Sequence, residues 1–148
     1  MPQNQTNIQT PGLFFIRVLT GIIFIMQGYG KVFTIGVTKV YELFFKIYET
    51  TVLPKWLVLS TAYYTSYVEL ICGFLLIMGL FRNYALYFLA VDLLIVSFGH
   101  GLMEPIGDLS HVLPRAILLA SLFLLPAQWD KWNADSVINK KAGSSFEN

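Results

Sequence analysis

The residues most able to do chemistry in this chain are five charged side chains inside long apolar segments. They are Arg17, Lys31, Glu69, Asp92 and Arg115. A charge at the centre of a transmembrane helix costs roughly 2.5–3.5 kcal/mol on insertion scales, so such residues are kept where they pair, face a cavity or have a function. Groups of both signs could bind a ligand or relay a proton. The alternative is that they are buried ion pairs which only set the register of the helices.

The composition places these segments in a membrane. Apolar residues make up 55% of the chain, charged residues 13%, and the mean hydropathy is +0.60. A water-soluble domain of this size has too much surface to cover with so few charges. Lys and Arg number 10 against 9 Asp and Glu, so we expect no nucleic-acid partner. The single cysteine, Cys72, excludes an intrachain disulfide.

Hydropathy predicts an all-α membrane protein, an antiparallel bundle of four transmembrane helices. The bundle occupies residues 13–128, between a polar N-terminal tail at 1–12 and a polar C-terminal tail at 129–148. The predicted spans are residues 13–33, 56–80, 84–99 and 109–125. The first two are long enough to cross ~30 Å of hydrocarbon at ~1.5 Å per residue, and the last two are short. Short links between the later spans favour antiparallel neighbours.

Residues 37–52, between the first two spans, have the pattern of an amphipathic helix. Their apolar residues recur at helical spacing, and two lysines and two glutamates take the other side. We expect this helix to lie in the membrane interface. The alternative is a lid that packs on the bundle.

Each predicted span has one stripe of small or polar residues, and each stripe carries a charge. The stripe of the first span consists of Arg17, Gly21, Phe24, Gly28 and Lys31. Its two glycines would let another helix approach closely. The stripes of the other spans carry Glu69, Asp92 and Arg115. We therefore predict that all four stripes point inward, with a structural core of Glu69 and Asp92 set among Arg17, Lys31 and Arg115.

A polar mouth is expected on the side of the bundle opposite the termini. Counting from the span midpoints places Lys31, His100 and His111 there, with the loop acids Glu104 and Asp108. We take Lys31, His100 and Arg115 as the candidate ligand-binding residues.

We set aside a metal or haem site at this mouth. Its histidines and acids are spaced across Pro105 and Gly107, which break any helix, so the geometry of a two-histidine zinc helix is lacking. No catalytic residue can be named from the pattern.

Basic residues orient the bundle only weakly. The side that holds both termini carries four basic residues, Arg82, Lys131, Lys140 and Lys141. The opposite side carries Lys39, Lys46 and Lys55, with Lys31 at the membrane edge. The positive-inside rule then favours termini in the cytoplasm.

Two segments resemble the DoxX family. IRVLTGIIFIMQGYGKVF, at residues 16–33, resembles the first span of that family, an Arg followed by G-x-x-F-x-x-x-G-x-x-K. YVELICGFLLIMGLFRNYA, at residues 67–85, resembles its second span. The resemblance covers residues 13–129 and matches Arg17, Lys31 and Glu69, with His100 and Arg115 also fitting. The chain departs from the family in its long segment 37–52 and in the residues that follow Pro126.

The resemblance implies a small four-helix protein of the bacterial inner membrane. Some relatives are subunits of thiosulfate:quinone oxidoreductase, and others belong to oxidative-stress complexes. The chain has no flavin, nicotinamide or iron–sulfur motif. We therefore expect no intrinsic cofactor, with a quinone as the ligand that the resemblance implies for Lys31, His100 and Arg115.

Three hypotheses follow for function. The first is an integral membrane subunit that supports a redox or quinone-linked complex, at most an accessory subunit of an oxidoreductase. The second is a non-catalytic scaffold whose charges are structural. The third is a small transporter or proton pathway, for which four spans are few unless the protein oligomerises. In the first two, the partners are the lipid bilayer and other membrane subunits.

Overall fold

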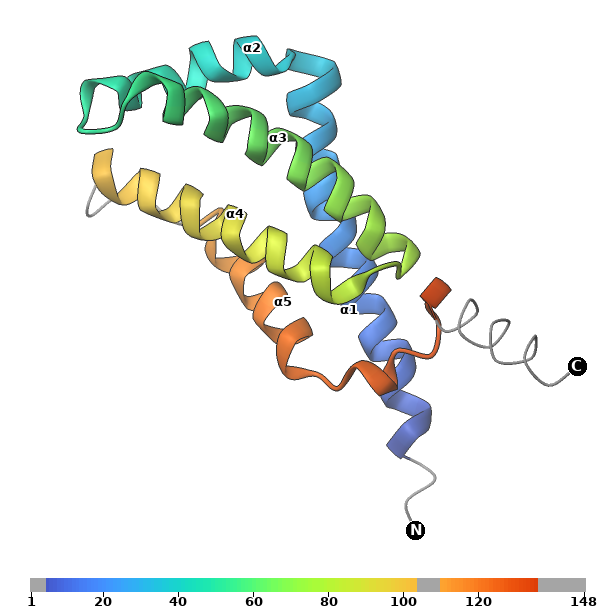
Figure 1. The fold of residues 1–148 in the computed structure, drawn as a ribbon. Coiled ribbons are helices and arrows are strands. Elements are labelled where there is room, and N and C mark those ends of the chain that lie inside the picture. The colour runs from blue at the N-terminus through green and yellow to red at the C-terminus, as the bar shows by residue number, and fades with distance from the viewer. Residues whose placement is uncertain (1–4, 104–109, 136–148) are drawn as a thin grey trace, which may run out of the picture.

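The computed structural model describes residues 5–103 and 110–135, and every regular element in these ranges is helical (Figure 1). In chain order they are α1 (Gln5–Tyr29), η1 (Gly30–Ile35), α2 (Val37–Val40), η2 (Tyr41–Phe45), η3 (Lys46–Thr50), α3 (Lys55–Met78), α4 (Arg82–Met103), α5 (Leu113–Leu124) and η4 (Ala127–Trp129). The η elements are π-helical at η1 and η2 and 3₁₀-helical at η3 and η4. The predicted all-α class is confirmed for the described residues.

Within the described ranges, three helices are long and apolar enough to cross a membrane. They are Ile8–Ile35, Lys55–Met78 and Arg82–Met103. The first of these runs from α1 into η1 without a break. Helix α1 begins at Gln5, before the predicted start of the span at residue 13, and contains Pro11. Helix α5 is apolar but has only 12 residues, which span ~18 Å of a ~30 Å hydrocarbon core. A fourth crossing therefore stays a prediction.

Helices α1 and α3 pack closely through glycines, as the stripe on the first span predicted. A Cβ atom on Gly73 would lie 2.5 Å from the backbone nitrogen of Ile25, and one on Gly21 would lie 2.8 Å from the carbonyl oxygen of Gly73. A Cβ atom on Gly28 would collide with the backbone of Leu70. Small residues are what allow two helix backbones to approach this closely in a membrane.

The turn between α3 and α4 reverses the chain sharply. Gly79 ends α3 in the left-handed region, at a φ of 67°. The Leu80 amide donates to the Leu75 carbonyl at 3.0 Å, which completes a Schellman-type cap. The glycine is required because other residues are strained in that conformation. Helices α3 and α4 can therefore run antiparallel and side by side (Figure 1).

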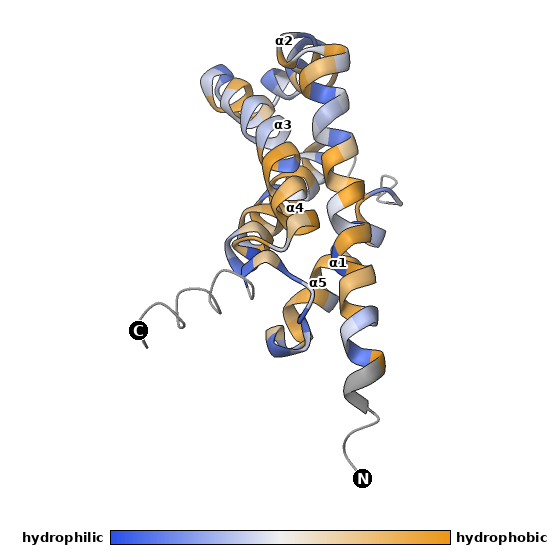
Figure 2. Ribbon diagram, turned by 90° about the vertical axis from the view of Figure 1, so that its right-hand side faces the viewer, coloured by the Kyte–Doolittle hydropathy of each residue, from blue (hydrophilic) through white to orange (hydrophobic). Residues whose placement is uncertain are grey.

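The outer surface of the bundle is apolar. Most of α1, α4 and α5 consists of hydrophobic residues, which are orange in Figure 2. Large hydrophobic side chains that are exposed on these helices include Phe15, Ile22, Met26, Tyr87, Leu94, Phe98, Ile117 and Phe123. Such a surface suits contact with lipid tails, because the backbone polar groups are satisfied within the helices.

The segment that follows η1 differs from the predicted single helix at 37–52. It is divided into α2, η2 and η3, and ends at Thr50. Val37, Val40 and Tyr41 are buried, and Tyr41 packs with Val58 and Ala62 of α3. These are the contacts that the lid alternative predicts. Whether the segment also lies in a membrane interface stays a prediction, since Leu43, Phe44 and Ile47 remain exposed.

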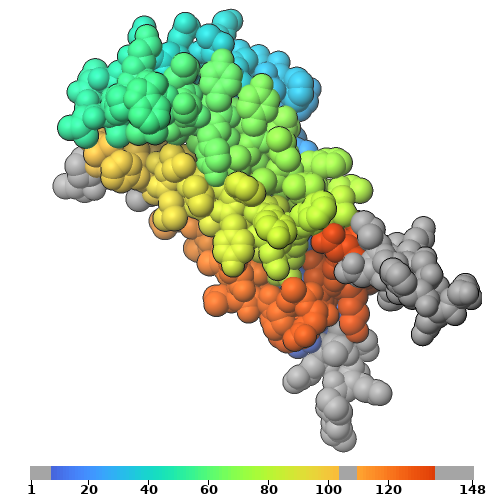
Figure 3. Space-filling model, viewed as in Figure 1, coloured from blue at the N-terminus to red at the C-terminus, as the bar shows by residue number. Residues whose placement is uncertain are grey.

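The residues after α5 also differ from the prediction, which placed 129–148 in a polar tail. Up to residue 135 the chain folds back against the middle of α1 and the C-terminal end of α3. The amide of Asp135 donates to the Gly79 carbonyl at 3.3 Å, and the rings of Trp132 and Phe14 meet edge to face at 5.5 Å. In the space-filling view this segment (red-orange) lies against the turn between α3 and α4 (Figure 3).

Candidate functional site

Glu69 is the centre of an ion-pair cluster that joins three helices. Its side chain is 1% exposed, on the small and polar face of α3. Lys31 Nζ lies 2.6 Å from Glu69 Oε2, and Arg115 Nη1 lies 3.8 Å from Glu69 Oε1. The predicted meeting of charges from separate helices thus occurs among Lys31, Glu69 and Arg115.

Lys31 reaches Glu69 from the π-helical turn η1, where α1 ends. Its side chain is 23% exposed, in contrast to the buried Glu69 carboxylate. A π-helical turn widens the helix locally and is frequent at functional sites.

In addition to its ion pair with Glu69, Arg115 is held by two hydrogen bonds. Its Nε donates to the His111 carbonyl at 2.7 Å, and its Nη1 donates to Gln27 Oε1 at 2.5 Å. These bonds fix the planar guanidinium between α1 and α5. Gln27, which the sequence analysis did not single out, is therefore part of the cluster. Its only sequence signal is that it is a polar residue in the middle of an apolar span, four residues before Lys31.

A cavity of about 630 Å³ opens beside this cluster. Its walls are mostly apolar and come from α3, α4, η2 and η3, whereas its polar lining is Gln27, Lys31, Tyr48, Thr61, Glu69, His100, His111 and Arg115. The volume is typical of a small-molecule site, and so is the combination of apolar walls with a few convergent polar groups. The structure thus brings all three candidate residues, Lys31, His100 and Arg115, to one cavity.

The two histidines stand next to each other at this cavity. The ring centroids of His100 and His111 are 4.8 Å apart. His100 Nδ1 lies 2.9 Å from the Val96 carbonyl oxygen, which orients that ring along α4. The ring of Tyr48 lies over the backbone of Gly99, with the nearest ring atoms 3.5 Å from the position of a glycine Cβ. Tyr48 of η3 therefore contacts α4 at Gly99, the residue before His100.

Asp92 does not join the ion pairs. It is fully buried on α4, and among the described residues neither carboxylate oxygen has a hydrogen-bond donor. It interacts electrostatically with Glu69, Lys31 and Arg115, without an ion pair in the described part of the chain. Of the three cations predicted to surround Glu69 and Asp92, Lys31 and Arg115 therefore lie against Glu69, and among the described residues none forms an ion pair with Asp92.

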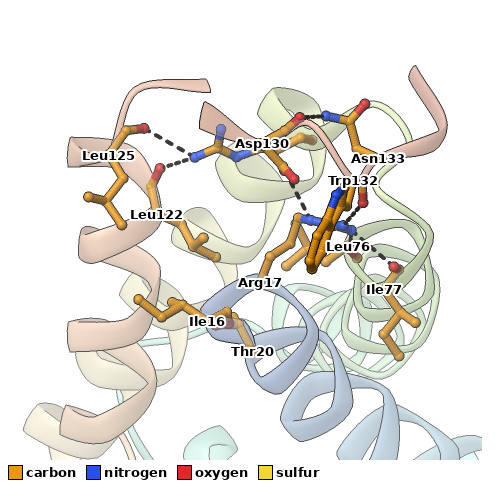
Figure 4. Close-up of polar contacts among 11 residues, drawn as sticks. Ile16, Arg17, Thr20, Leu76, Ile77, Leu122, Leu125, Asp130, Trp132 and Asn133 are labelled. Carbon is orange, nitrogen blue, oxygen red and sulfur yellow. Dashed lines mark hydrogen bonds and ion pairs between the residues drawn. The ribbon is translucent and has the colours of Figure 1, made fainter. Parts of the chain in front are cut away.

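Arg17 belongs to a different cluster, in which its guanidinium meets Asp130 and backbone carbonyls at the end of α3 (Figure 4). Its Nε lies 3.0 Å from Asp130 Oδ2, and both side chains are 1% exposed. Fourteen residues separate Arg17 from Lys31, which corresponds to ~21 Å along a helix. The prediction that Arg17 surrounds Glu69 and Asp92 is therefore wrong, because its partner comes from the segment that folds back after α5.

Arg17 also completes the C-terminal end of α3. It donates to the carbonyls of Leu76 and Ile77, the latter at 3.0 Å, and to the Trp132 carbonyl at 2.6 Å. The last carbonyls of a helix have no partner within it, and a cation there is favoured by the helix dipole. Arg17 therefore acts as a structural clamp between α1, α3 and the returning segment.

Arg82 plays the same part for α5. Its Nη2 donates to the carbonyls of Leu122 at 2.5 Å and Leu125 at 3.3 Å. From the sequence, Arg82 contributed only to the predicted orientation of the bundle. Its role as a cap could have been predicted from its place at the start of the third span, because the end of the fourth span is expected on the same side of the membrane.

Other predicted features of the mouth lie outside the described residues. These are Glu104 and Asp108, with the loop that contains them. Within residues 5–103 and 110–135, no three His, Cys, Asp or Glu residues gather as a metal site would require.

The fold and the cavity define a multi-pass helical membrane protein with a charged cluster inside its bundle. A family model described as DoxX matches residues 12–101, which is more than half of the 148 residues. The chain belongs to the DoxX family. The match includes Lys31, Glu69 and His100 and ends before α5, which carries Arg115. No curated protein and no solved structure matches the chain.

Proposed function

We propose that this protein is an integral subunit of a redox or quinone-linked complex in the bacterial inner membrane, with both termini in the cytoplasm. Its cavity would bind a quinone headgroup or an anionic substrate. The observation that carries the proposal is the junction of an apolar cavity with the Lys31–Glu69–Arg115 cluster. In this role the protein is at most an accessory subunit, and the quinone or another subunit carries the electrons.

The donor set suits a carbonyl or oxyanion acceptor. Lysine has three N–H donors and arginine has five, so Lys31 and Arg115 can keep Glu69 and still donate to a ligand. Hydrogen bonds from charged donors are shorter and about twice as strong as neutral ones. Glu69 would hold both cations in place, and His100, which lines the same cavity, would present its ring to the ligand.

A direct binding experiment tests this proposal. A soluble ubiquinone analogue is titrated into purified protein in detergent, and its dissociation constant is compared between wild type and the Lys31→Ala/Arg115→Ala double variant. Loss of two charge-assisted hydrogen bonds, at ~1.5–3 kcal/mol each, should weaken binding by well over tenfold. Equal binding by both proteins would refute the assignment of the site.

Two further variants serve as controls for this comparison. Lys39→Ala/Lys55→Ala removes two exposed lysines outside the cavity, and should leave binding unchanged. Lys31→Met/Glu69→Gln/Arg115→Met removes the three charges of the cluster together, so that none of the three is left buried without its partner. This triple variant should fold and still fail to bind, which separates loss of the donors from loss of the fold.

A second candidate function is a non-catalytic scaffold that assembles other membrane subunits. The contacts of Arg17 and Arg82 favour it, because these buried charges end on helix carbonyls and on Asp130 rather than in the cavity. Native mass spectrometry of the purified assembly would distinguish the two functions. A scaffold predicts that substitutions in the Lys31 cluster lower the amount of complex but leave the activity per complex intact.

A further inference from the structure

The cavity reaches the lipid-facing surface of the bundle. Four of its lining residues are also exposed large hydrophobics: Leu94 and Phe98 of α4, Phe44 of η2 and Leu57 of α3. Leu94 is 70% exposed and Phe98 is 62% exposed. Val91, which precedes Leu94 by one helical turn, is exposed as well but does not line the cavity. The cavity therefore ends at the exposed apolar surface of the bundle.

The lining of the cavity is divided between a charged cluster and an apolar rim. The charged groups are Lys31, Glu69 and Arg115, which meet one another. Other polar groups, on Tyr48, Thr61 and His100, come from the same elements as the apolar walls, and the exposed rim residues Leu57, Leu94 and Phe98 are apolar. A ligand that satisfies both ends has a polar head at the ion-pair cluster and a hydrocarbon tail at the rim. For a water-soluble anion, the apolar half of the cavity would contribute nothing.

We propose that the cavity is a lateral binding site for a single-tailed amphiphile dissolved in the bilayer. The head of this ligand accepts hydrogen bonds from Lys31 and Arg115, and its tail leaves the protein between α3 and α4, past Leu57 and Leu94. This inference rests on the proposed function. It adds the path by which the ligand enters the cavity from the bilayer, and it identifies the hydrocarbon tail as the part of the ligand that requires this path. Lipid tails are as apolar as leucine, so a tail can pass between the bilayer and this rim without crossing water.

The test uses two quinones with the same headgroup, one with a ten-carbon tail and one without a tail. Both are titrated into protein in phospholipid nanodiscs, and the concentration of the tailed ligand is expressed per lipid. The rim variant is Leu57→Trp/Leu94→Trp, which adds bulk at two exposed residues that line the cavity. Its matched control is Leu59→Trp/Val91→Trp, on the same two helices, at exposed positions that do not line the cavity.

The rim variant should weaken binding of the tailed quinone by about tenfold, equal to ~1.4 kcal/mol, and leave the tailless quinone unchanged. The control variant should alter neither. Retained binding of the tailless quinone also shows that the rim variant is folded. If the rim variant binds the tailed quinone as wild type does, the lateral route is refuted and the proposed function stands. If neither quinone binds to wild type, the proposed function fails, and the inference fails with it.

A second measurement locates the tail directly in the wild-type protein. A tailed quinone that carries a diazirine at mid-tail is photolysed in nanodiscs, and the labelled residues are identified by mass spectrometry. Labels on Leu94, Phe98 or Leu57 that an excess of unlabelled quinone suppresses would support the route. Labels spread evenly over Val91 and Leu59, and not suppressed by competition, would overturn it.

Discussion

Removing the negative charge of Asp130 should destabilise the whole bundle, although this residue lies beyond the last long helix. Its carboxylate faces the Arg17 guanidinium at 3.0 Å, with both side chains 1% exposed. Breaking a buried ion pair by removal of one partner typically costs about 3–5 kcal/mol, because the other charge is left uncompensated. Asn keeps an oxygen that can accept one hydrogen bond, so we expect Asp130→Asn to fall near the lower end, about 3 kcal/mol.

The loss should be mutual between the two partners. Arg17→Met leaves Asp130 unpaired and frees the carbonyls of Ile77 and Trp132, so it should cost at least as much as Asp130→Asn. The double variant Arg17→Met/Asp130→Leu replaces the pair by apolar groups of similar size. It should recover much of the stability, since such replacements of a buried pair are often neutral.

Thermal unfolding in detergent, followed by circular dichroism, measures these differences, and a double-mutant cycle gives the coupling between the two residues. Glu42→Gln, which removes an exposed carboxylate of η2, is the control and should change little. The reasoning would be refuted if Asp130→Asn stayed within about 0.5 kcal/mol of wild type, the range expected for a surface substitution.

Three further predictions concern the interior of the bundle, and each is measured by the same unfolding assay. Gly73→Ala should destabilise the protein by about 1–3 kcal/mol, because its Cβ would lie 2.5 Å from the backbone of α1; Gly12→Ala, where a Cβ has nothing within 4 Å, is the control and should not destabilise. Glu69→Gln should destabilise, because it removes the ion-pair partner of Lys31 and Arg115, whereas Asp92→Asn should be neutral or stabilising, because the Asp92 carboxylate has no donor in the described part of the chain. The opposite order of these two variants would contradict the assignment of Glu69 as the centre of the cluster. Arg82→Met should destabilise by about 1–3 kcal/mol, because it leaves the carbonyls at the end of α5 without their donor; Arg82→Lys, with a single ammonium that cannot reach two carbonyls in a fixed plane, should restore only part of the loss.

Packing within the α1–α3 pair could be predicted from local spacing. Gly21 and Gly28 lie seven residues apart on the face that carries Arg17 and Lys31, and the structure places both against α3. The buried face of α3, which includes Glu69, follows from the same helical periodicity. Such spacing shows which side of a helix is inward, because each residue turns about 100° from the last.

Which charges pair could not be obtained from that spacing. Arg17 and Lys31 share one face of the first predicted span, and the sequence suggested both as partners for Glu69. In the structure, Lys31 forms an ion pair with Glu69, whereas Arg17 forms one with Asp130. The choice depends on a segment after α5 that returns to the end of α3, and nothing in the apolar pattern of the spans records that return.

The sequence by itself determined the environment of this protein and the inward faces of its helices, because hydropathy and helical periodicity are properties of neighbouring residues. It also placed the DoxX family motifs on those faces. The tertiary structure alone decided that Arg115 and Gln27 meet beside Glu69, that Arg82 caps α5, and that Leu57 and Leu94 form the rim of one cavity. These contacts join residues far apart in the chain, so they depend on how the helices cross and where the chain turns back.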